Sequence, residues 1–102
     1  MKKPVGMAFK LLIKEEANAD IVKAYSYYET KKTGLGDRFI ETLYEHFQRI
    51  RNTPELFPKK NRNFREAVMS HFPYLIIYRI EDDVIYVLSI FITWMDPRQK
   101  PQ

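Results

Sequence analysis

Residues 74–92, YLIIYRIEDDVIYVLSIFI, decide the fold because two strongly apolar runs flank one acidic turn. Tyr74–Ile80 and Val84–Thr93 are rich in isoleucine, valine and aromatic side chains, which favour β-strands. Glu81-Asp82-Asp83 lies between them and predicts a three-residue hairpin loop. The second run is apolar on both faces apart from Ser89, which is typical of a central strand.

Two further strands are predicted upstream of this hairpin. Phe64–Met69 has the same composition, and Phe72-Pro73 separates it from Tyr74. The segment Pro54–Asn63 before it carries prolines and asparagines and reads as a loop. Ala8–Ile13, AFKLLI, predicts a short first strand near the N-terminus.

Between the first strand and the loop the apolar period becomes helical. One stripe falls at Ile21, Ala24, Tyr25 and Tyr28, and the next contains Phe39, Leu43, Phe47 and Ile50. The GLG joint at 34–36 is short, so we expect two antiparallel helices. The order β-α-α-β-β-β predicts an α+β fold with the helical hairpin packed on one face of the sheet.

The length of 102 residues fits one domain, which we place at 7–97, with an N-terminal extension at 1–6 and a C-terminal tail at 98–102. A hydrophobic share of 45%, with 15% aromatic residues, excludes a disordered chain. The absence of cysteine excludes disulfides and thiolate chemistry and agrees with a cytoplasmic location. No apolar run approaches the roughly 20 residues of a membrane helix.

The net charge of +4 is unevenly distributed. The stretch from Arg49 to Arg65 holds six basic residues and one acid, Glu55, for a local net charge of +5. One interpretation is a solvated loop that maintains solubility. The other is a surface for phosphates or for an acidic protein partner.

Basic and aromatic residues also fall on the predicted strands. His46 and His71 have no second strong ligand at a suitable spacing, so we expect no metal ion and no cofactor. A surface with cations and aromatic rings can bind nucleic acid, and RNA cleavage would also need proton transfer. The candidate catalytic residues are Arg65, His71, Tyr78 and Arg79. The candidate target-binding or nucleic-acid-binding residues are Lys59, Lys60, Arg62, Trp94, Arg98 and Lys100. The alternative is that Tyr74 and Tyr78 are half-buried sheet residues and Arg79 is simply exposed.

Three stretches carry a resemblance to a known family. They are Ala17-x-x-Asp20-Ile21-x-x-Ala24-x-x-Tyr27-Tyr28-Glu29 with Gly34-Leu35-Gly36-x-Arg38-Phe39, then Arg65…Phe72-Pro73-Tyr74-x-Ile76-Ile77-Tyr78-Arg79-Ile80, and Phe91-x-Thr93-x-x-Asp96-Pro97. In this order and spacing, from Met7 to Pro97, the chain resembles RelE/ParE toxins. The resemblance implies a compact α+β fold with a curved antiparallel sheet. It also implies a toxin of a type II toxin–antitoxin pair. The antitoxin would dock on the helical hairpin and on exposed apolar sheet surface, in a toxin–antitoxin hetero-oligomer.

The resemblance leaves two targets open. One branch of the family cleaves messenger RNA on the ribosome without a metal, and the other inhibits DNA gyrase without cleavage. Cleaving relatives often carry arginine where this chain has Leu75, and many members have histidine at Ile92 and arginine at Met95. Apolar side chains cannot transfer protons or pair with phosphate. We therefore favour a ParE-like gyrase inhibitor. The alternatives are an mRNA endonuclease using Arg65, Arg79, Tyr78 and His71, and a decayed toxin kept for antitoxin binding.

Overall fold

The computed structural model describes residues 9–60 and 63–101. The helices are α1 (Glu15–Lys31) and α2 (Leu35–Asn52), and single 3₁₀ turns lie at Pro54–Leu56 and Pro97–Gln99. The strands are β1 (Lys10–Ile13), β2 (Arg65–Val68), β3 (Tyr74–Glu81) and β4 (Val84–Ile92). The predicted element order is confirmed. The predicted extension at 1–6 lies outside the described residues.

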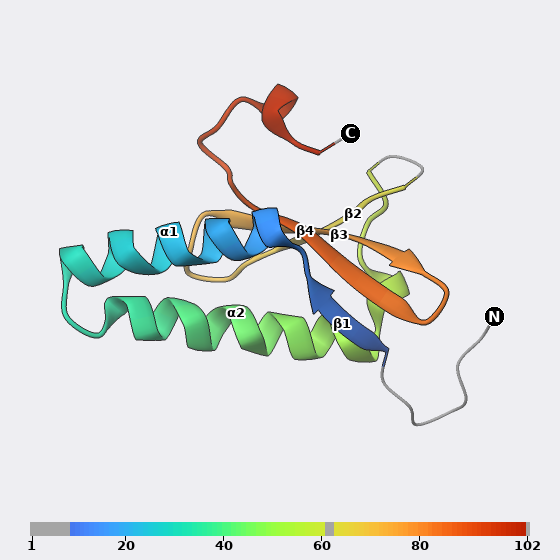
Figure 1. Ribbon diagram of the computed structural model, residues 1–102, viewed down its shortest axis with the longest axis horizontal. Coiled ribbons are helices and arrows are strands. Elements are labelled where there is room, and N and C mark those ends of the chain that lie inside the picture. The colour runs from blue at the N-terminus through green and yellow to red at the C-terminus, as the bar shows by residue number, and fades with distance from the viewer. Residues whose placement is uncertain (1–8, 61–62, 102) are drawn as a thin grey trace.

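The helices form the predicted antiparallel hairpin (Figure 1). The turn between them is closed by Glu29, whose two carboxylate oxygens accept the N–H groups of Gly34 and Gly36, each at 2.9 Å. Gly34 has φ of 89°, a left-handed conformation that glycine adopts without steric cost. Acidic residues begin both helices and basic residues end them, as the helix dipole favours.

The four strands form one sheet in the order β1-β4-β3-β2, so β4 is central as predicted. Strands β2, β3 and β4 are antiparallel, whereas β1 pairs parallel to β4, so the sheet is mixed rather than wholly antiparallel. The helical hairpin joins β1 to the other strands, and so long a connection permits either direction of pairing. The β3–β4 loop contains two residues rather than three, because Glu81 pairs with Val84.

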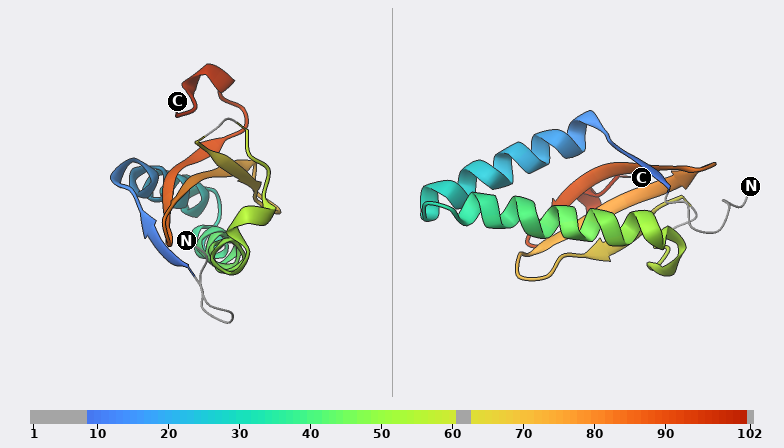
Figure 2. Two further views of the ribbon diagram at one scale, coloured as in Figure 1. Left: turned by 90° about the vertical axis from the view of Figure 1, so that its right-hand side faces the viewer. Right: turned by 90° about the horizontal axis from the view of Figure 1, so that it is seen from below.

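The main core lies between the helical hairpin and one face of the sheet (Figure 2). Phe39 packs edge-on against Phe72 and Tyr74, with ring centroids 5.3 Å apart in both pairs. Tyr74 and Tyr78 are buried in this core, at 6% and 0% exposure. An accessible surface position for Tyr78 is therefore wrong, and both tyrosines are more deeply buried than the half-buried alternative, whereas Trp94 is exposed. Both tyrosines lie on the face of β3 that the helices cover.

The opposite face of the sheet carries a second apolar cluster of Phe64, Ile77 and Phe91. The chain after β4 returns over this side of the sheet (Figure 2). Lys100 donates to the buried Glu66 carboxylate at 3.0 Å, and its ammonium lies 5.8 Å from the Phe91 ring centroid. Residues predicted to be a tail outside the domain are thus attached to the sheet.

Candidate functional site: a basic pocket beside strand β2

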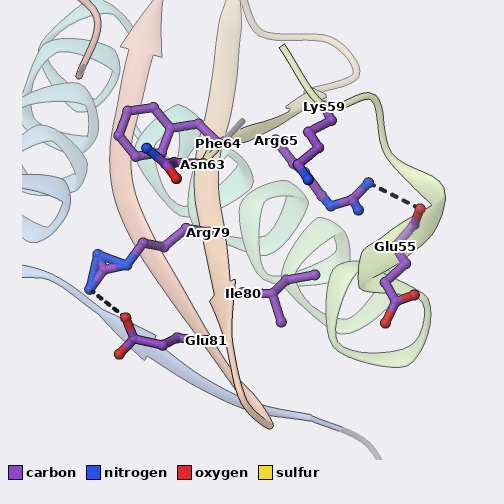
Figure 3. A pocket seen from close by; sticks show the side chains of 8 residues that line it. All are labelled: Glu55, Lys59, Asn63, Phe64, Arg65, Arg79, Ile80 and Glu81. Atoms are coloured by element: carbon purple, nitrogen blue, oxygen red, sulfur yellow. Dashed lines mark hydrogen bonds and ion pairs between the residues drawn. The ribbon is translucent and has the colours of Figure 1, made fainter. Parts of the chain in front are cut away.

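The charged strip predicted from sequence leads into a pocket of about 660 Å³ near the β2 edge of the sheet (Figure 3). Three basic side chains and two acidic ones line it. They are Lys59, Arg65, Arg79, Glu55 and Glu81. The structure therefore brings together Arg65 and Arg79, which are far apart in the sequence, with the loop residue Lys59. These five charges sum to one net positive charge, so the pocket attracts anions weakly.

Arg65 is held by the loop that precedes β2. Its Nη1 atom donates to the backbone carbonyls of Glu55 at 3.1 Å and Phe57 at 2.8 Å (Figure 3 shows the first). These bonds satisfy carbonyl groups of the 3₁₀ turn and fix that turn against the strand. The main role of Arg65 is thus to hold the loop against β2. It also contributes a positive charge at a fixed position in the pocket.

Arg79 is the pocket's more available cation. Its guanidinium carbon lies 4.7 Å from the centroid of the Tyr86 ring, and Nη2 is 3.9 Å from the Glu81 carboxylate. Its Nε is buried and has no hydrogen-bond partner among the described residues. Stacking on Tyr86 and the contact with Glu81 orient the guanidinium, which contributes a positive charge to the lining of the pocket.

Tyr78 is buried and its hydroxyl is engaged within the protein. Its hydroxyl donates to the Pro54 carbonyl at 2.5 Å, and burial raises its pKa to about 12 despite the nearby positive charge of Arg65. A fully buried phenol whose proton is engaged cannot exchange that proton with a substrate at the surface. The structure places Tyr78 as a core residue that anchors the loop after α2.

The two histidines lie away from this pocket. His71 is exposed in the β2–β3 loop, with φ of 68°, at the opposite end of β3 from Arg79. His46, on α2, is buried and its Nε2 accepts the Ser70 N–H at 3.0 Å. Ser70 Oγ is also 3.2 Å from that nitrogen. Because the amide occupies the acceptor lone pair, the pair fixes the loop rather than activating the serine.

The predicted binding residues are dispersed. Lys60 is exposed beside the C-terminal segment, and Arg62 lies outside the described residues. Trp94 is 74% exposed and lines a different groove, together with Tyr27, Ile92 and Met95. Arg98 is exposed and paired with Asp96 at 2.6 Å, which lowers the pKa of that carboxyl. Lys100 forms an ion pair with Glu66.

The sequence did not reveal Glu55 and Glu81 as members of the pocket, or Tyr86 as the ring on which Arg79 stacks. Tyr86 lies directly opposite Arg79 in the β3–β4 register. A two-residue loop at Asp82-Asp83 would have paired these residues, whereas the predicted three-residue loop displaced the register. A correct loop length would therefore have predicted the contact of Arg79 with Tyr86, since side chains on directly opposite residues of an antiparallel pair are neighbours.

The positions expected to carry cleavage chemistry are apolar and lie apart. Leu75 packs on the Phe64, Ile77 and Phe91 cluster. Ile92 and Met95 line the groove with Trp94. Within the described part of the chain, no three acidic or histidine residues gather where they could hold a metal ion. No helix there is long and apolar enough to cross a bilayer.

The fold and this pocket define a small α+β protein with a helical hairpin on a four-stranded sheet and charged binding surfaces. A solved chain from a chromosomal ParDE toxin–antitoxin system of P. aeruginosa has this fold, with a TM-score of 0.74 and 16% sequence identity. The match covers 83% of this chain and 96% of that one. A search of curated proteins finds no match.

The family model of the ParE toxin of the type II toxin–antitoxin system parDE matches residues 11–97. The chain therefore belongs to the ParE toxin family, and a cognate antitoxin is its partner. The earlier resemblance to RelE/ParE toxins is confirmed at the level of this family.

Proposed function

We propose that this ParE-family toxin acts by binding its target, DNA gyrase, in the cytoplasm, without cleaving nucleic acid. Binding without cleavage is supported by the burial, hydrogen bonding and positions of the residues that were expected to catalyse cleavage. Tyr78 is buried with its hydroxyl bonded to Pro54, Arg65 is held by two carbonyls, and His71 lies at the far end of β3. Leu75, Ile92 and Met95 supply no proton and no charge.

The test is inhibition of gyrase by the purified protein. We expect induction in cells to be toxic and the protein to reduce gyrase supercoiling of relaxed plasmid. A toxic phenotype with undiminished supercoiling would remove gyrase as the target. Harmless expression in the absence of antitoxin would favour the decayed toxin instead.

A second candidate function has one observation in its favour. Glu55 and Glu81 line the same pocket as Lys59 and Arg79, and a carboxylate can act as a general base beside cations that stabilise phosphate charge. This arrangement supports a ribosome-dependent mRNA endonuclease with shifted catalytic residues. Primer extension on messages from induced cells distinguishes it: new cleavage sites that disappear in both Glu55→Gln and Glu81→Gln would favour cleavage over gyrase binding.

A further inference from the structure

The C-terminal segment after β4 is attached to the sheet chiefly by side chains. Thr93 N–H donates to the Pro73 carbonyl at 2.8 Å. Beyond it, within the described part of the chain, no backbone hydrogen bond joins residues 96–101 to a strand. The bonds that form there are local, such as that from Gln99 N–H to the Asp96 carbonyl at 2.9 Å. A segment without backbone pairing to its support opens more readily than the strands beneath it.

The sheet beneath this segment carries one buried acid. Glu66 on β2 is 7% exposed and lies opposite Ile77 in the β2–β3 register. Phe64 and Ile77 line the same cavity as Glu66, and Phe91 belongs to their apolar cluster. A carboxylate buried beside apolar side chains is destabilising unless a donor or a cation meets it. This place on the sheet therefore favours a positively charged group.

Lys100 supplies that group from the C-terminal segment. Its Nζ atom lies 3.0 Å from the Glu66 carboxylate and 5.8 Å from the Phe91 ring centroid. Among the described residues, Lys100 is the only cation that pairs with Glu66. The fit is loose, because a cavity of about 220 Å³ remains between the segment and the sheet. Lys100 thus shows which chemistry this site accepts: a cation on a flexible stem that reaches a buried carboxylate beside an aromatic ring.

This site adjoins the basic pocket. Phe64 lines both the pocket that contains Lys59 and Arg79 and the cavity under the C-terminal segment. A protein bound at the pocket therefore lies beside Glu66 once the segment moves aside. The pocket attracts acidic groups and the Glu66 carboxylate attracts basic ones, so the combined surface fits a partner that carries both.

We propose that a lysine or arginine side chain of the toxin's protein target binds Glu66 in place of Lys100. The cation receptor is Glu66 with the apolar cluster of Phe64, Ile77 and Phe91. In the free chain Lys100 occupies this receptor, and on binding the C-terminal segment moves off the sheet. The segment thereby weakens target binding, because only the fraction of molecules with an open receptor is competent to bind. The inference rests on the proposed function, in which the target is DNA gyrase.

The two partners of this ion pair should have opposite effects on gyrase. Lys100→Ala opens the receptor and keeps its carboxylate, so we expect inhibition of supercoiling at a protein concentration about threefold or more lower. Glu66→Gln also releases the segment but removes the carboxylate, so inhibition should need about tenfold or more protein. Gln99→Ala, an exposed neighbour in the same segment, should match wild type. Weaker inhibition by both Lys100→Ala and Glu66→Gln, or no change in either, would overturn the proposal.

A small probe tests the receptor without gyrase. The probe is the hexylammonium ion, which has the charge and the alkyl chain of a lysine side chain. We expect it to shift the NMR signals of Ile77 and Phe91 in Lys100→Ala, and to shift them far less in wild type and in Glu66→Gln. Absence of these shifts in Lys100→Ala would overturn the receptor, whichever protein the toxin binds. Shifts as expected, in a chain that leaves gyrase uninhibited, would support the receptor and contradict gyrase as its partner.

Discussion

At the scale of single residues, several polar groups of this protein hold distant segments together through backbone hydrogen bonds. Asp20 on α1 accepts the Ile90 N–H at 3.0 Å and the Ser89 hydroxyl at 3.2 Å. These contacts lie next to the bulge in β4, where the pairing shifts between Ile77 and Tyr78. A bulge leaves backbone groups without ladder partners, and a carboxylate from the helix satisfies one of them.

Removing this carboxylate should therefore destabilise the fold. In Asp20→Ala the partly buried Ile90 amide loses its acceptor, and we expect a loss of about 1–3 kcal/mol in the free energy of unfolding. Ser89→Ala removes only the weaker bond and serves as the control, with a smaller loss. Urea denaturation measures both, and equal stabilities of Asp20→Ala and Ser89→Ala would contradict the assignment.

Gly36 is required by close packing rather than by its backbone angles. A Cβ at this position would lie 2.8 Å from the Tyr25 carbonyl oxygen and 2.9 Å from the Glu29 carboxylate. We expect Gly36→Ala to cost about 1–3 kcal/mol of stability, as overpacking does. Gly34 has open space around it but a φ of 89°, so Gly34→Asn should be tolerated far better, since asparagine adopts left-handed angles. Thermal unfolding compares the two variants. A Gly36→Ala protein as stable as Gly34→Asn would show that the helical hairpin shifts to accommodate the added methyl group, which would contradict the prediction.

His46 makes stability depend on pH. Burial, followed by the positive charge of Arg49, lowers its pKa below the ordinary value of 6.5, and its Nε2 must be unprotonated to accept the Ser70 N–H. As pH falls through about 6.5 the unfolded chain takes up a proton that the folded chain does not. Stability is therefore full above this pH and declines below it, until the folded-state pKa is reached.

The measurement is the free energy of unfolding between about pH 7.5 and pH 5, a window around the ordinary histidine pKa. We expect His46→Gln to flatten the decline that the wild-type chain shows, because the titrating group is gone. His71→Gln removes the exposed histidine and should retain the decline. A slope that His46→Gln leaves unchanged would place the responsible group elsewhere.

At the scale of elements, the C-terminal segment serves as a cover for the sheet face that the helices leave free. Pro97, Lys100 and Pro101 line a cavity of about 220 Å³ with Phe64 and Ile77. The ion pair of Lys100 and Glu66 contributes to this attachment, because Glu66 is only 7% exposed and needs the Lys100 ammonium to compensate its burial.

Breaking this pair should detach the segment. In Lys100→Ala the buried Glu66 carboxylate loses its partner, and we expect a loss of about 1–3 kcal/mol or more in unfolding free energy. The exposed pair of Arg98 and Asp96 is the control, and Arg98→Ala should leave the unfolding midpoint unchanged. Limited proteolysis should cut after β4 faster in Lys100→Ala only. Equal proteolysis of both variants would contradict a role for Lys100 as the anchor.

At the scale of the whole molecule, the two candidate surfaces lie at opposite edges of the sheet. The basic pocket adjoins β2, and a groove lined by Leu11, Tyr44 and Phe47 adjoins β1. The strand order separates them by β4 and β3. A target at the pocket and a partner at the α2 side of the groove therefore contact different side chains.

This separation predicts that the two activities can be lost independently. We expect Arg79→Ala, which removes the stacked pocket cation, to reduce gyrase inhibition while antitoxin affinity stays within about threefold of wild type. Tyr44→Glu places a charge on the exposed face of α2, in the helical hairpin on which we expect the antitoxin to dock, and should show the reverse. Supercoiling and affinity assays on both variants, with Lys23→Ala on exposed α1 as a control, measure the outcome. Parallel losses of both activities in each variant would indicate a single shared surface.

How much of this protein could be predicted depends on the range of the interactions involved. The helical stripes of Ile21 and Phe39 and the apolar run of β4 were readable because burial imposes a period on neighbouring residues. The motifs in the same segments indicated the family, which the family model confirms over residues 11–97. Composition and periodicity thus determined the element order and the central strand, whereas the family was indicated by the resemblance of the motifs.

Tertiary structure alone decided what the charged and polar residues do. Arg65 and Tyr78 looked like site residues in the sequence, but their partners are carbonyls of Glu55, Phe57 and Pro54. The parallel direction of β1, and the pairing of Lys100 with Glu66, likewise depend on segments that meet only after folding. A polar side chain has no period that reveals its partner, because hydrogen bonds and ion pairs are satisfied by whichever group the fold brings within reach.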